Sequence, residues 1–424
     1  MREMKDSGIA WIGVIPQDWE IVRTKSLYCS AKEIAGDRAD DFERLALTLN
    51  GVIKRSKEDS VGLQPEKFSG YQILKKGELV FKLIDLENVA TSRVGLSPYT
   101  GIVSPAYIVL SKQSRAKDLV VRYSMYHFLS MWQREIFNQM GDNGVRSSLN
   151  TKELLNIPHP FPSICEQKRI VTFLDAQCAE IDTVLEKTRA SIEEYKKLKQ
   201  AVITQAVTKG IRGDRPMKDS GIEWIGDIPA EWDVIRVKQL LKERNERSKE
   251  GKEEPLSMSQ KVGLVPTKFL DSIPNMASSF VGAKLAYVDD LVFNKLKAHL
   301  GVFSVSRYDG LVSPDYAVYC STGKSNLKYL EYIFKTPQCI GEFRKKSTGI
   351  AAGLMRLYTE GLFSIYLPYP ALSEQEEIAE YLNEKCAGID ALIAKKQQYL
   401  TEIENYKKSL IYEYVTGKKE VHPL

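Results

Sequence analysis

Apolar residues recur at a spacing close to 3.5 in two long segments, about 165–207 and 373–415. Lys and Glu fill most of the other positions, so each apolar stripe is narrow. This pattern predicts two long helices, each with the seam of a coiled coil. The stripe of the second segment consists of Ile389, Ile393, Leu400, Ile403, Leu410 and Tyr414, interrupted by Lys396 and Lys407, and that of the first consists of Ile181, Leu185, Ile192, Tyr195 and Val202.

The length of these helices predicts how they pack. A helix of about 40 residues is roughly 60 Å long at 1.5 Å per residue, which is longer than a domain of this size covers. The alternative, a lone amphipathic helix on the core of its own domain, fits this length poorly. We expect the two helices to pair antiparallel and to satisfy each other's seams, which gives the molecule a pseudo-twofold axis.

Outside the long helices the pattern is mixed. Short apolar runs such as Leu79–Ile84 and Ile102–Leu110 lie between turn residues and predict strands. Patterns of helical period occur at about 119–140 and 327–345. The combination predicts globular parts of the α/β or α+β class.

The chain contains the same unit twice. The run MKDSGIAWIGVIPQDW that begins at Met4 returns as MKDSGIEWIGDIPAEW at Met217. A last block runs without gaps from Leu149 and again from Leu357, and it includes the long helix. Two tryptophans in register around an Ile-Pro pair are very improbable by chance, so the repetition decides the architecture.

The repeat predicts four segments. We expect globular domains at 1–160 and 214–370. A long helix with its connector follows the first domain at 161–213, and a long helix with a C-terminal tail follows the second at 371–424.

The composition permits DNA binding without requiring it. The chain has 424 residues, with 60 Lys and Arg against 55 Asp and Glu, so its net charge is only +5. Its six cysteines are scattered and form no CxxC pair, which argues against a zinc site or a disulfide framework and fits a reducing cytoplasm. There is no apolar stretch long enough for an export signal or a membrane span.

Motifs of catalysis are absent from the sequence. There is no GxSxG, no GxGxxG after a strand and no HExxH. The four histidines, His127, His159, His299 and His422, occupy non-equivalent positions in the two repeats. A catalyst built on histidine would need its residues twice, so we expect no catalytic residues and no metal site in this chain.

Several repeated blocks resemble the specificity (S) subunits of type I restriction–modification systems. The element W-I-G-x-I-P-x-x-W opens each half. A VSPxY block follows it, and a Glu-Gln-x-x-Ile helix start comes last, in the same order in both halves. The blocks are Trp11–Lys25 and Trp224–Lys238, Val103–Tyr107 and Val312–Tyr316, Arg356–Tyr358, Glu166–Ile170 and Glu374–Ile378. The resemblance spans essentially the whole chain.

The resemblance implies a non-catalytic DNA-recognition subunit. Two target-recognition domains would each read one half of an asymmetric, bipartite site, and the helices would form a spacer that sets the gap. The partners implied are double-stranded DNA and two modification subunits, which methylate adenine with S-adenosylmethionine. A restriction/translocase subunit, where the host has one, would use ATP and Mg. This chain itself would hold no cofactor.

Candidate phosphate contacts lie after repeated strands and beside glycines. Polar residues follow the repeated Leu-Val-Phe strand, and basic residues beside Gly, Ser or Thr precede the last block of each repeat. They are Lys82, Asn294, Lys295 and Lys297 in the first group and Arg146, Lys345, Lys346 and Arg356 in the second. The alternatives are ordinary solvated lysines and, for Arg146 and Arg356, a brace to a carboxylate.

Base-specific contacts are expected where the repeats diverge, at about 30–75 and 243–285. The candidates there are Lys54, Arg55, Lys57, Lys261 and Lys268. Recurrent aromatic residues are expected to be structural instead, namely Trp11, Trp19, Trp224, Trp232, Tyr99, Tyr107, Tyr308 and Tyr316. The charged helix faces and the repeated Glu-Gln starts are candidate docking sites for the modification subunits.

Two other functions remain open from the sequence. In the first, the chain is a purely structural coiled-coil scaffold, which would bind DNA without sequence preference. It would alternatively be a DNA nuclease or methyltransferase with unrecognised motifs, which would transfer methyl groups without a partner.

Overall fold

The computed structural model describes residues 2–30, 32–59, 67–86, 93–140, 148–260, 262–270, 280–349 and 355–421. The chain forms two compact units. Unit 1 comprises Met1–Arg189 and Gln398–Leu424, and unit 2 comprises Ala190–Gln397. Each unit therefore contains one globular part and a portion of both long helices, α5 (Ile164–Lys209) and α9 (Leu372–Val415).

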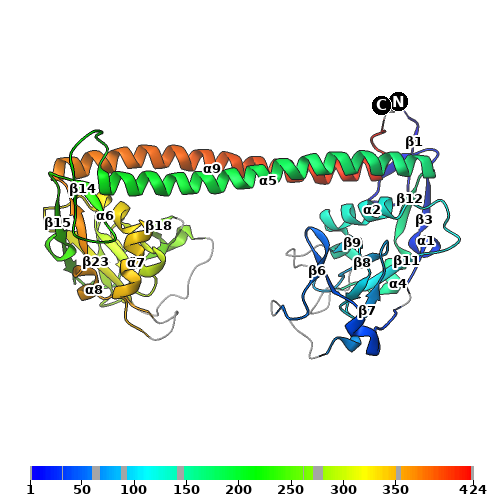
Figure 1. Cartoon of the computed structure of the whole chain (residues 1–424), viewed down its shortest axis with the longest axis horizontal. Helices are drawn as coiled ribbons and strands as arrows, with labels where there is room; N and C mark the ends of the chain where they lie inside the picture. The colour runs from blue at the N-terminus through cyan, green and yellow to red at the C-terminus, as the bar shows by residue number, and fades with distance from the viewer. Residues whose placement is uncertain are drawn as a thin grey trace. The chain divides into compact units, whose positions relative to one another are not determined.

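The globular part of unit 1 is built from short strands and helices (Figure 1). Its strands are β1 (Met4–Asp6), β2 (Val14–Pro16), β3 (Glu20–Arg23), β4 (Tyr28–Cys29), β5 (Arg44–Thr48), β6 (Gly51–Arg55), β7 (Gln72–Leu74), β8 (Leu79–Phe81), β9 (Val94–Leu96), β10 (Gly101–Val103), β11 (Ile108–Lys112) and β12 (Pro158–Phe161). Its helices are α1 (Thr24–Leu27), α2 (Val121–Gln133), α3 (Ile136–Met140) and α4 (Thr151–Asn156), with 3-10 turns η1 (Gly36–Asp41) and η2 (Phe68–Gly70).

The globular part of unit 2 has elements of the same kinds in nearly the same order. Its strands are β13 (Met217–Asp219), β14 (Asp227–Pro229), β15 (Asp233–Arg236), β16 (Leu241–Arg244), β17 (Leu256–Ser259), β18 (Gly263–Pro266), β19 (Lys284–Ala286), β20 (Leu291–Asn294), β21 (Phe303–Val305), β22 (Gly310–Val312), β23 (Tyr316–Ser321) and β24 (Tyr366–Tyr369). Its helices are α6 (Leu327–Phe334), α7 (Pro337–Lys346) and α8 (Thr359–Phe363), with 3-10 turns η3 (Val237–Gln239), η4 (Thr267–Phe269) and η5 (Ala298–Leu300).

Equivalent strands pair in the same order in the two units. The central sheet has the order β4-β11-β8-β9 in unit 1 and β16-β23-β20-β21 in unit 2. Beside it, β5 pairs with β6 and β10 with β7, as β17 pairs with β18 and β22 with β19. The predicted mixed α/β class and tandem repeat are therefore confirmed. The predicted helical stretches are each broken in two, because Glu135 adopts a left-handed φ of 57° and Pro337 starts a new helix.

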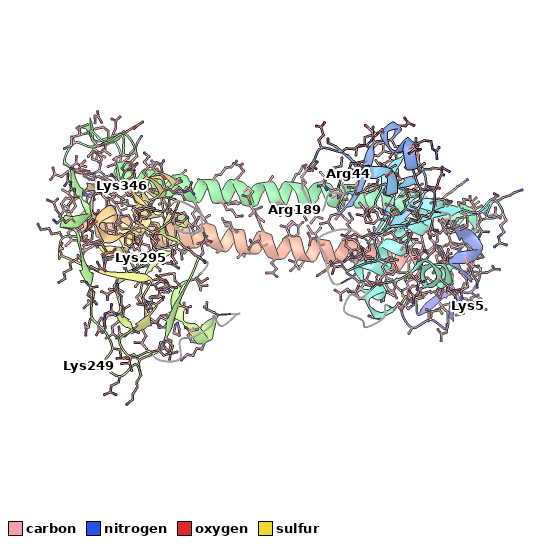
Figure 2. The ribbon with its side chains drawn as sticks, turned by 90° about the horizontal axis from the view of Figure 1, so that it is seen from below. Lys5, Arg44, Arg189, Lys249, Lys295 and Lys346 are labelled. Carbon is pink, nitrogen blue, oxygen red and sulfur yellow. The ribbon has the colours of Figure 1, made fainter. Side chains whose placement is uncertain are left out.

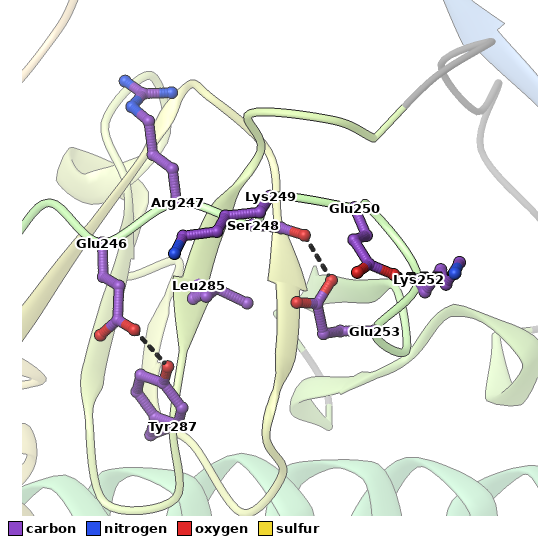
Figure 3. Close-up of a pocket in the computed structure, with 9 residues that line it drawn as sticks. All are labelled: Glu246, Arg247, Ser248, Lys249, Glu250, Lys252, Glu253, Leu285 and Tyr287. Atoms are coloured by element: carbon purple, nitrogen blue, oxygen red, sulfur yellow. Dashed lines mark hydrogen bonds and ion pairs between the residues drawn. The ribbon is translucent and has the colours of Figure 1, made fainter.

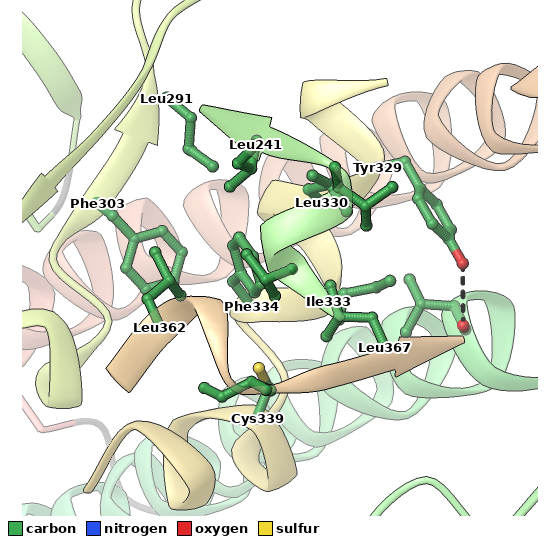
Figure 4. Close-up of a cluster of buried hydrophobic side chains, with 14 of the residues drawn as sticks. Leu241, Leu291, Phe303, Tyr329, Leu330, Ile333, Phe334, Cys339, Leu362 and Leu367 are labelled. Carbon is green, nitrogen blue, oxygen red and sulfur yellow. Dashed lines mark hydrogen bonds between the residues drawn. The ribbon is translucent and has the colours of Figure 1, made fainter. Parts of the chain in front are cut away.

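The two units differ in the continuity of their cores. In unit 2 one apolar cluster runs from the central sheet through α6 to both long helices (Figure 4). In unit 1 the apolar side chains form two main clusters at the equivalent places. Between them lie Ser124, His127 and His159, all at most 1% exposed. The corresponding residues of unit 2 are Leu330, Ile333 and Leu367, so apolar side chains there make the core continuous.

The long helices pair antiparallel within each unit, as the seams predicted. In unit 1, Asp182 of α5 binds Lys407 of α9 at 2.6 Å, and Arg189 further along α5 binds Glu404 at 2.6 Å. In unit 2, Lys199 binds Asp390 at 2.6 Å. Lys407 thus interrupts the apolar stripe because it bridges the two helices. Lys396, the other interruption, lies over the Tyr195 ring at 5.7 Å.

The Glu-Gln pairs at the helix starts are buried anchors, so the prediction that their side chains dock a partner is wrong. Gln167 is fully buried, and its side chain accepts from the Val120 backbone N–H at 2.8 Å and donates to the Pro162 carbonyl at 2.9 Å. Gln375 repeats both bonds, with Asn326 at 3.0 Å and Pro370 at 3.0 Å. These residues recur because they fix each long helix to its own globular part.

Candidate nucleic-acid interface

The end of strand β20 gathers most of the basic residues predicted in unit 2. The Lys295 backbone N–H donates to the Asp315 carbonyl at 3.2 Å, and its ammonium donates to the Pro314 carbonyl at 3.3 Å. The Lys295 carbonyl in turn accepts from the Leu357 N–H at 3.0 Å. The loop after β20, the loop before β23 and the segment at Arg356 therefore meet at one edge, although they lie far apart in the sequence.

Helix α7 ends close to the same edge with three more cations, of which Lys345 is paired with Glu342 at 2.7 Å. Its last turn carries Arg344, Lys345 and Lys346, a favourable placement at the negative end of the helix dipole. Arg344 donates to the His299 carbonyl at 3.4 Å, next to the exposed Lys297. Lys346 is exposed and has no ionic partner among the residues that the structure describes. Figure 2 shows Lys295 and Lys346 on the globular part of unit 2.

The position of Arg356 is compatible with both of its predicted roles, a contact to DNA and a brace to a carboxylate. Its guanidinium lies 3.5 Å from the Asp315 carboxylate, and the two side chains are 41% and 48% exposed. Arg356 also forms a bridge to Thr348, just after α7. The side chain is thus braced by a carboxylate and still half open to solvent. Asn294 is more enclosed, and its side-chain oxygen accepts from the Leu296 N–H at 3.1 Å.

The matching edge of unit 1 has fewer exposed cations among its described residues. Lys82 follows β8 as predicted, but it is partly buried, and burial together with the nearby Arg93 guanidinium lowers its pKa. Arg93 is fully buried and donates to the carbonyls of Ile84 and Asp85, which holds the turn after β8. In unit 2 the equivalent of Arg93 is the apolar Val302. Arg93 was not among the predicted residues, and no local pattern marks it.

Two predicted residues cannot be placed. Arg146 and Lys261 lie outside the residues that the structure describes. They remain predictions from the sequence alone.

The basic residues of the divergent stretches are mostly paired with acids. Lys54 binds Glu43 at 2.5 Å, Arg55 binds Asp59 at 2.9 Å, and Lys268 binds Glu254 at 3.1 Å. Lys57 binds the Ala39 carbonyl at 2.8 Å and Asp40 at 3.3 Å. The pairs of Lys54 and Lys268 are exposed and therefore weak, so these two side chains can reach a phosphate or a base edge, whereas Arg55 and Lys57 are partly buried.

A charged surface pocket in the divergent part of unit 2 was missed by the sequence analysis. It is lined by the segment Glu246–Glu253, which includes Arg247, Lys249 and Lys252, and by Leu285 and Tyr287 (Figure 3). Ser248 donates to Glu253 at 2.6 Å and the Tyr287 hydroxyl donates to Glu246 at 2.8 Å. Cations and carboxylates alternate along this segment, which is why its local charge gave no signal.

The recurrent aromatic residues divide into two groups. Trp19 and Trp232 are at most 1% exposed, and Tyr107 and Tyr316 pack against buried clusters, as expected of structural residues. Tyr99 and Tyr308 are 38% and 37% exposed instead. The prediction of core packing is wrong for those two, because they lie in the turns between β9 and β10 and between β21 and β22.

The outer faces of the long helices carry apolar residues at heptad spacing. On α9 they are Leu392, Tyr399 and Tyr406, which are 44%, 49% and 55% exposed. On α5 they are Val184 and Leu198, at 39% and 48%. We call these residues the outer stripe, of which Val184, Tyr399 and Tyr406 belong to unit 1 and Leu198 and Leu392 to unit 2. They lie beside the seam and are not needed to close it.

The described residues contain no group of three or more His, Cys, Asp and Glu side chains able to hold a metal ion. Within the same residues, there is no helix both long and apolar enough to cross a membrane.

Two relatives match the chain over nearly its whole length and a third over about two thirds of it, although no family model matches the sequence. The type I restriction enzyme MjaVIII specificity subunit of Methanocaldococcus jannaschii is 23% identical over 431 residues, covering 97% of this chain and 95% of the relative. The putative type I restriction enzyme MjaX specificity subunit of the same organism is 25% identical over 432 residues, with 97% and 96% covered. The EcoDI specificity subunit of Escherichia coli is 21% identical and covers 69% of each chain.

Solved structures share the fold. A chain from a type I R-M system, solved to explain complex assembly and conformational transition, has a TM-score of 0.70 at 15% identity and covers 96% of this chain and 99% of its own. The HsdS subunit of Thermoanaerobacter tengcongensis has a TM-score of 0.50 at 15% identity, with 96% and 98% covered. Over nearly its full length the chain is similar in sequence to specificity subunits of type I restriction enzymes, and it shares the fold of the solved HsdS subunit.

Proposed function

We propose that the chain is the non-catalytic DNA-recognition subunit of a type I restriction–modification complex. Each unit reads one half of an asymmetric, bipartite DNA site. The paired helices form the spacer that sets the gap between the halves, and they hold two adenine-methyltransferase subunits. The names of the curated relatives support this assignment over their full length.

One observation carries the proposal for DNA reading. The two units repeat the same strand pairing and the same edge after β8 and β20, yet the exposed residues at that edge differ. A scaffold needs no such difference, because its contacts are made by the framework. Two readers of different half-sites need it, since the framework positions the protein and the exposed side chains specify the bases.

The outer stripe supports docking of the modification subunits on the long helices. Exposed Leu and Tyr at heptad spacing form the face that a partner helix packs against in a helical bundle. Tyr399 and Tyr406 also add the amphipathic rings that are enriched at protein interfaces. We propose that a helix of the modification subunit packs on the outer stripe. The outer stripe thus takes the place of the buried Glu-Gln pairs as the proposed docking site.

The chemistry resides in the partners. The modification subunits bind S-adenosylmethionine, and a restriction subunit, where present, uses ATP and Mg. This chain binds none of these groups, and the complex works in the cytoplasm. The predicted domain limits at 160, 213 and 370 are part of the same proposal, with residues 30–150 carrying the reading surface of the first domain.

Methylation mapping tests the proposal. The chain is produced with its modification partner, and methylated adenines are located at base resolution. We expect one bipartite, asymmetric motif with a fixed gap. Replacing residues 30–150 by those of a relative should change one half of the motif and leave the other half and the gap intact. A change in both halves, or a motif without a gap, would contradict the proposal.

The two alternative functions give different results. Incubation of the pure chain with DNA and labelled S-adenosylmethionine should yield no methylated DNA, whereas an enzyme would transfer the label without a partner. A scaffold would give a complex that binds all duplexes equally.

A further inference from the structure

The turn before β11 and the turn before β23 have the same backbone hydrogen bonds. In unit 1 the Ala106 N–H donates to the Ser104 hydroxyl at 3.3 Å and the Tyr107 N–H to the Ser104 carbonyl at 3.1 Å. In unit 2 the Asp315 N–H donates to Ser313 at 3.3 Å and the Tyr316 N–H at 2.9 Å. The position held by Ala106 in one unit is therefore held by Asp315 in the other.

A second pair of positions matches in the same way. The Leu149 N–H donates to the Leu83 carbonyl at 2.9 Å, as the Leu357 N–H does to the Lys295 carbonyl at 3.0 Å. The residues just before these leucines are Ser148 and Arg356. Each forms an isolated β-bridge to a neighbouring segment.

The backbone at these two matched positions is the same in both units although the side chains differ. In unit 1 both hold small, exposed and uncharged side chains, Ala106 and Ser148. In unit 2 they hold the half-exposed Asp315–Arg356 pair at 3.5 Å. An ion pair this exposed and this long adds little to stability. Its presence at a matched position, in only one unit, points to a ligand outside the protein.

The charged residues around the Asp315–Arg356 pair indicate the chemical class of this ligand. Lys295, Lys297 and Lys346 make this edge attractive to phosphates, and a carboxylate among them weakens that attraction. Asp315 is about half exposed, so its carboxylate can accept a hydrogen bond from a ligand in addition to the one from Arg356. Among DNA bases, the amino group of cytosine donates to Asp or Glu in the major groove, and guanine O6 and N7 accept from Arg.

We propose that Arg356 and Asp315 together read one G·C base pair in the major groove. Arg356 donates to guanine and Asp315 accepts from the amino group of the paired cytosine. Guanine O6 and cytosine N4 lie side by side because they pair with each other. The Arg356 and Asp315 side chains, whose charged groups lie 3.5 Å apart, are therefore close enough to contact these two atoms at the same time. The inference rests on the proposed function and adds to it a specific base pair in the half-site read by unit 2.

The test uses the full chain with its modification partner and compares four variants by methylation mapping. Asp315→Ala and Arg356→Lys should each relax the same single G·C position in one half of the motif, with the other half unchanged. Methylation of the original site should fall about tenfold to a hundredfold relative to the degenerate sites. Arg356→Lys keeps the charge and loses the two-pronged donor, so a mere phosphate contact would survive it.

The third variant is a matched control. Arg212→Ala removes another exposed Arg–carboxylate pair of unit 2, the one with Glu377 at 2.7 Å, and should leave the motif intact. Thermal unfolding of each variant checks the fold. If Arg356→Lys keeps the motif and Arg356→Ala lowers methylation at all sites equally, Arg356 binds a phosphate and the inference is wrong. A wild-type complex with no bipartite motif would instead overturn the proposed function itself.

Discussion

The indole N–H of Trp19 donates to the Glu166 carboxylate at 3.0 Å, and both residues are buried. Trp232 repeats this bond to Glu374 at 2.9 Å in unit 2. An arginine completes each site, Arg2 at 2.5 Å from Glu166 and Arg215 at 2.7 Å from Glu374. The opening tryptophan motif of each repeat thus meets the start of a long helix, which explains why both blocks recur together.

Removal of the Glu374 carboxylate should destabilise unit 2. Glu374→Ala leaves the Arg215 guanidinium, whose side chain is 10% exposed, without its buried partner. We expect a loss of about 3–5 kcal/mol in the free energy of unfolding, measured by scanning calorimetry. Glu377→Ala, on the same helix face with an exposed arginine partner, should change the unfolding temperature little. Equal effects of the two substitutions would show that the buried site has no special role.

Unit 1 should lose stability in mild acid because of its buried histidines. Burial lowers the pKa of His159 to about 4, and burial together with the neighbouring His159 ring lowers the pKa of His127 well below its usual value. Unfolded histidine has a pKa of about 6.5. The unfolded chain therefore binds protons that the folded chain excludes. The stabilisation is complete above pH 6.5 and is lost as the pH falls towards 4, on the order of 3 kcal/mol for His159.

Replacing these residues by those of unit 2 tests this explanation. The triple substitution Ser124→Leu, His127→Ile and His159→Leu should flatten the dependence of stability on pH between about 6.5 and 4. Urea unfolding followed by the fluorescence of Trp11, whose ring lies 5.7 Å from that of His127, reports on this site. An unchanged pH dependence in the triple variant would place the acid sensitivity elsewhere.

Lys346 should contribute to DNA affinity without contributing to sequence preference. Its exposed ammonium at the end of α7 is placed to displace one counterion from a phosphate. Lys346→Ala should reduce the slope of log K against log salt by about 0.9 and leave the methylation motif unchanged. Titration of the assembled complex with duplex at several salt concentrations measures the slope. Lys197→Ala, on the outer surface of α5, should leave it unaltered.

The outer stripe should control assembly with the modification subunit. Tyr399→Ala combined with Tyr406→Ala should weaken the complex at least about tenfold, since buried tyrosines are common centres of binding energy. Because both side chains are about half exposed, the stability of the chain alone should hardly change. Thr401→Ala with Lys408→Ala has the same spacing on another face of α9 and provides the control. Calorimetric titration of the two subunits compares the pairs.

Shortening both long helices by a heptad should narrow the gap and leave both halves of the motif readable, although it also removes Tyr399 of the outer stripe. Deleting 187–193 from α5 and 395–401 from α9 keeps the seam in phase and removes about 10 Å of helix. At about 3.4 Å per base pair, the gap in the mapped motif should shrink by about three base pairs while both halves persist. Loss of one half, with the gap retained, would contradict the role of the helices as a spacer.

Part of the fold followed from local patterns. The heptad seams predicted α5, α9 and their antiparallel pairing, and the repeated blocks predicted two units of one architecture. A long, narrow apolar stripe at heptad spacing is buried most simply in a coiled coil. This prediction therefore needs no knowledge of distant contacts. The resemblance to specificity subunits came from the same blocks.

The candidate site was predicted less completely. The sequence pointed to Lys295 and Arg356 separately, but not to their meeting at one edge through Asp315. It also suggested that Glu166 and Gln167 face a partner, whereas both are buried. The amino-acid sequence shows that a charged residue recurs in both repeats. It does not show whether the partner of that residue lies inside the protein or outside it.

The sequence by itself determined the duplicated plan, the long paired helices and the absence of known catalytic motifs. Tertiary structure alone decided which charges are buried, which are paired within the chain and which remain exposed for a ligand. The physical reason is range: periodicity acts between residues a few positions apart, whereas the environment of a charge depends on segments brought together by folding. Arg93 and Arg356 illustrate this, since one holds a buried turn and the other is half open to solvent.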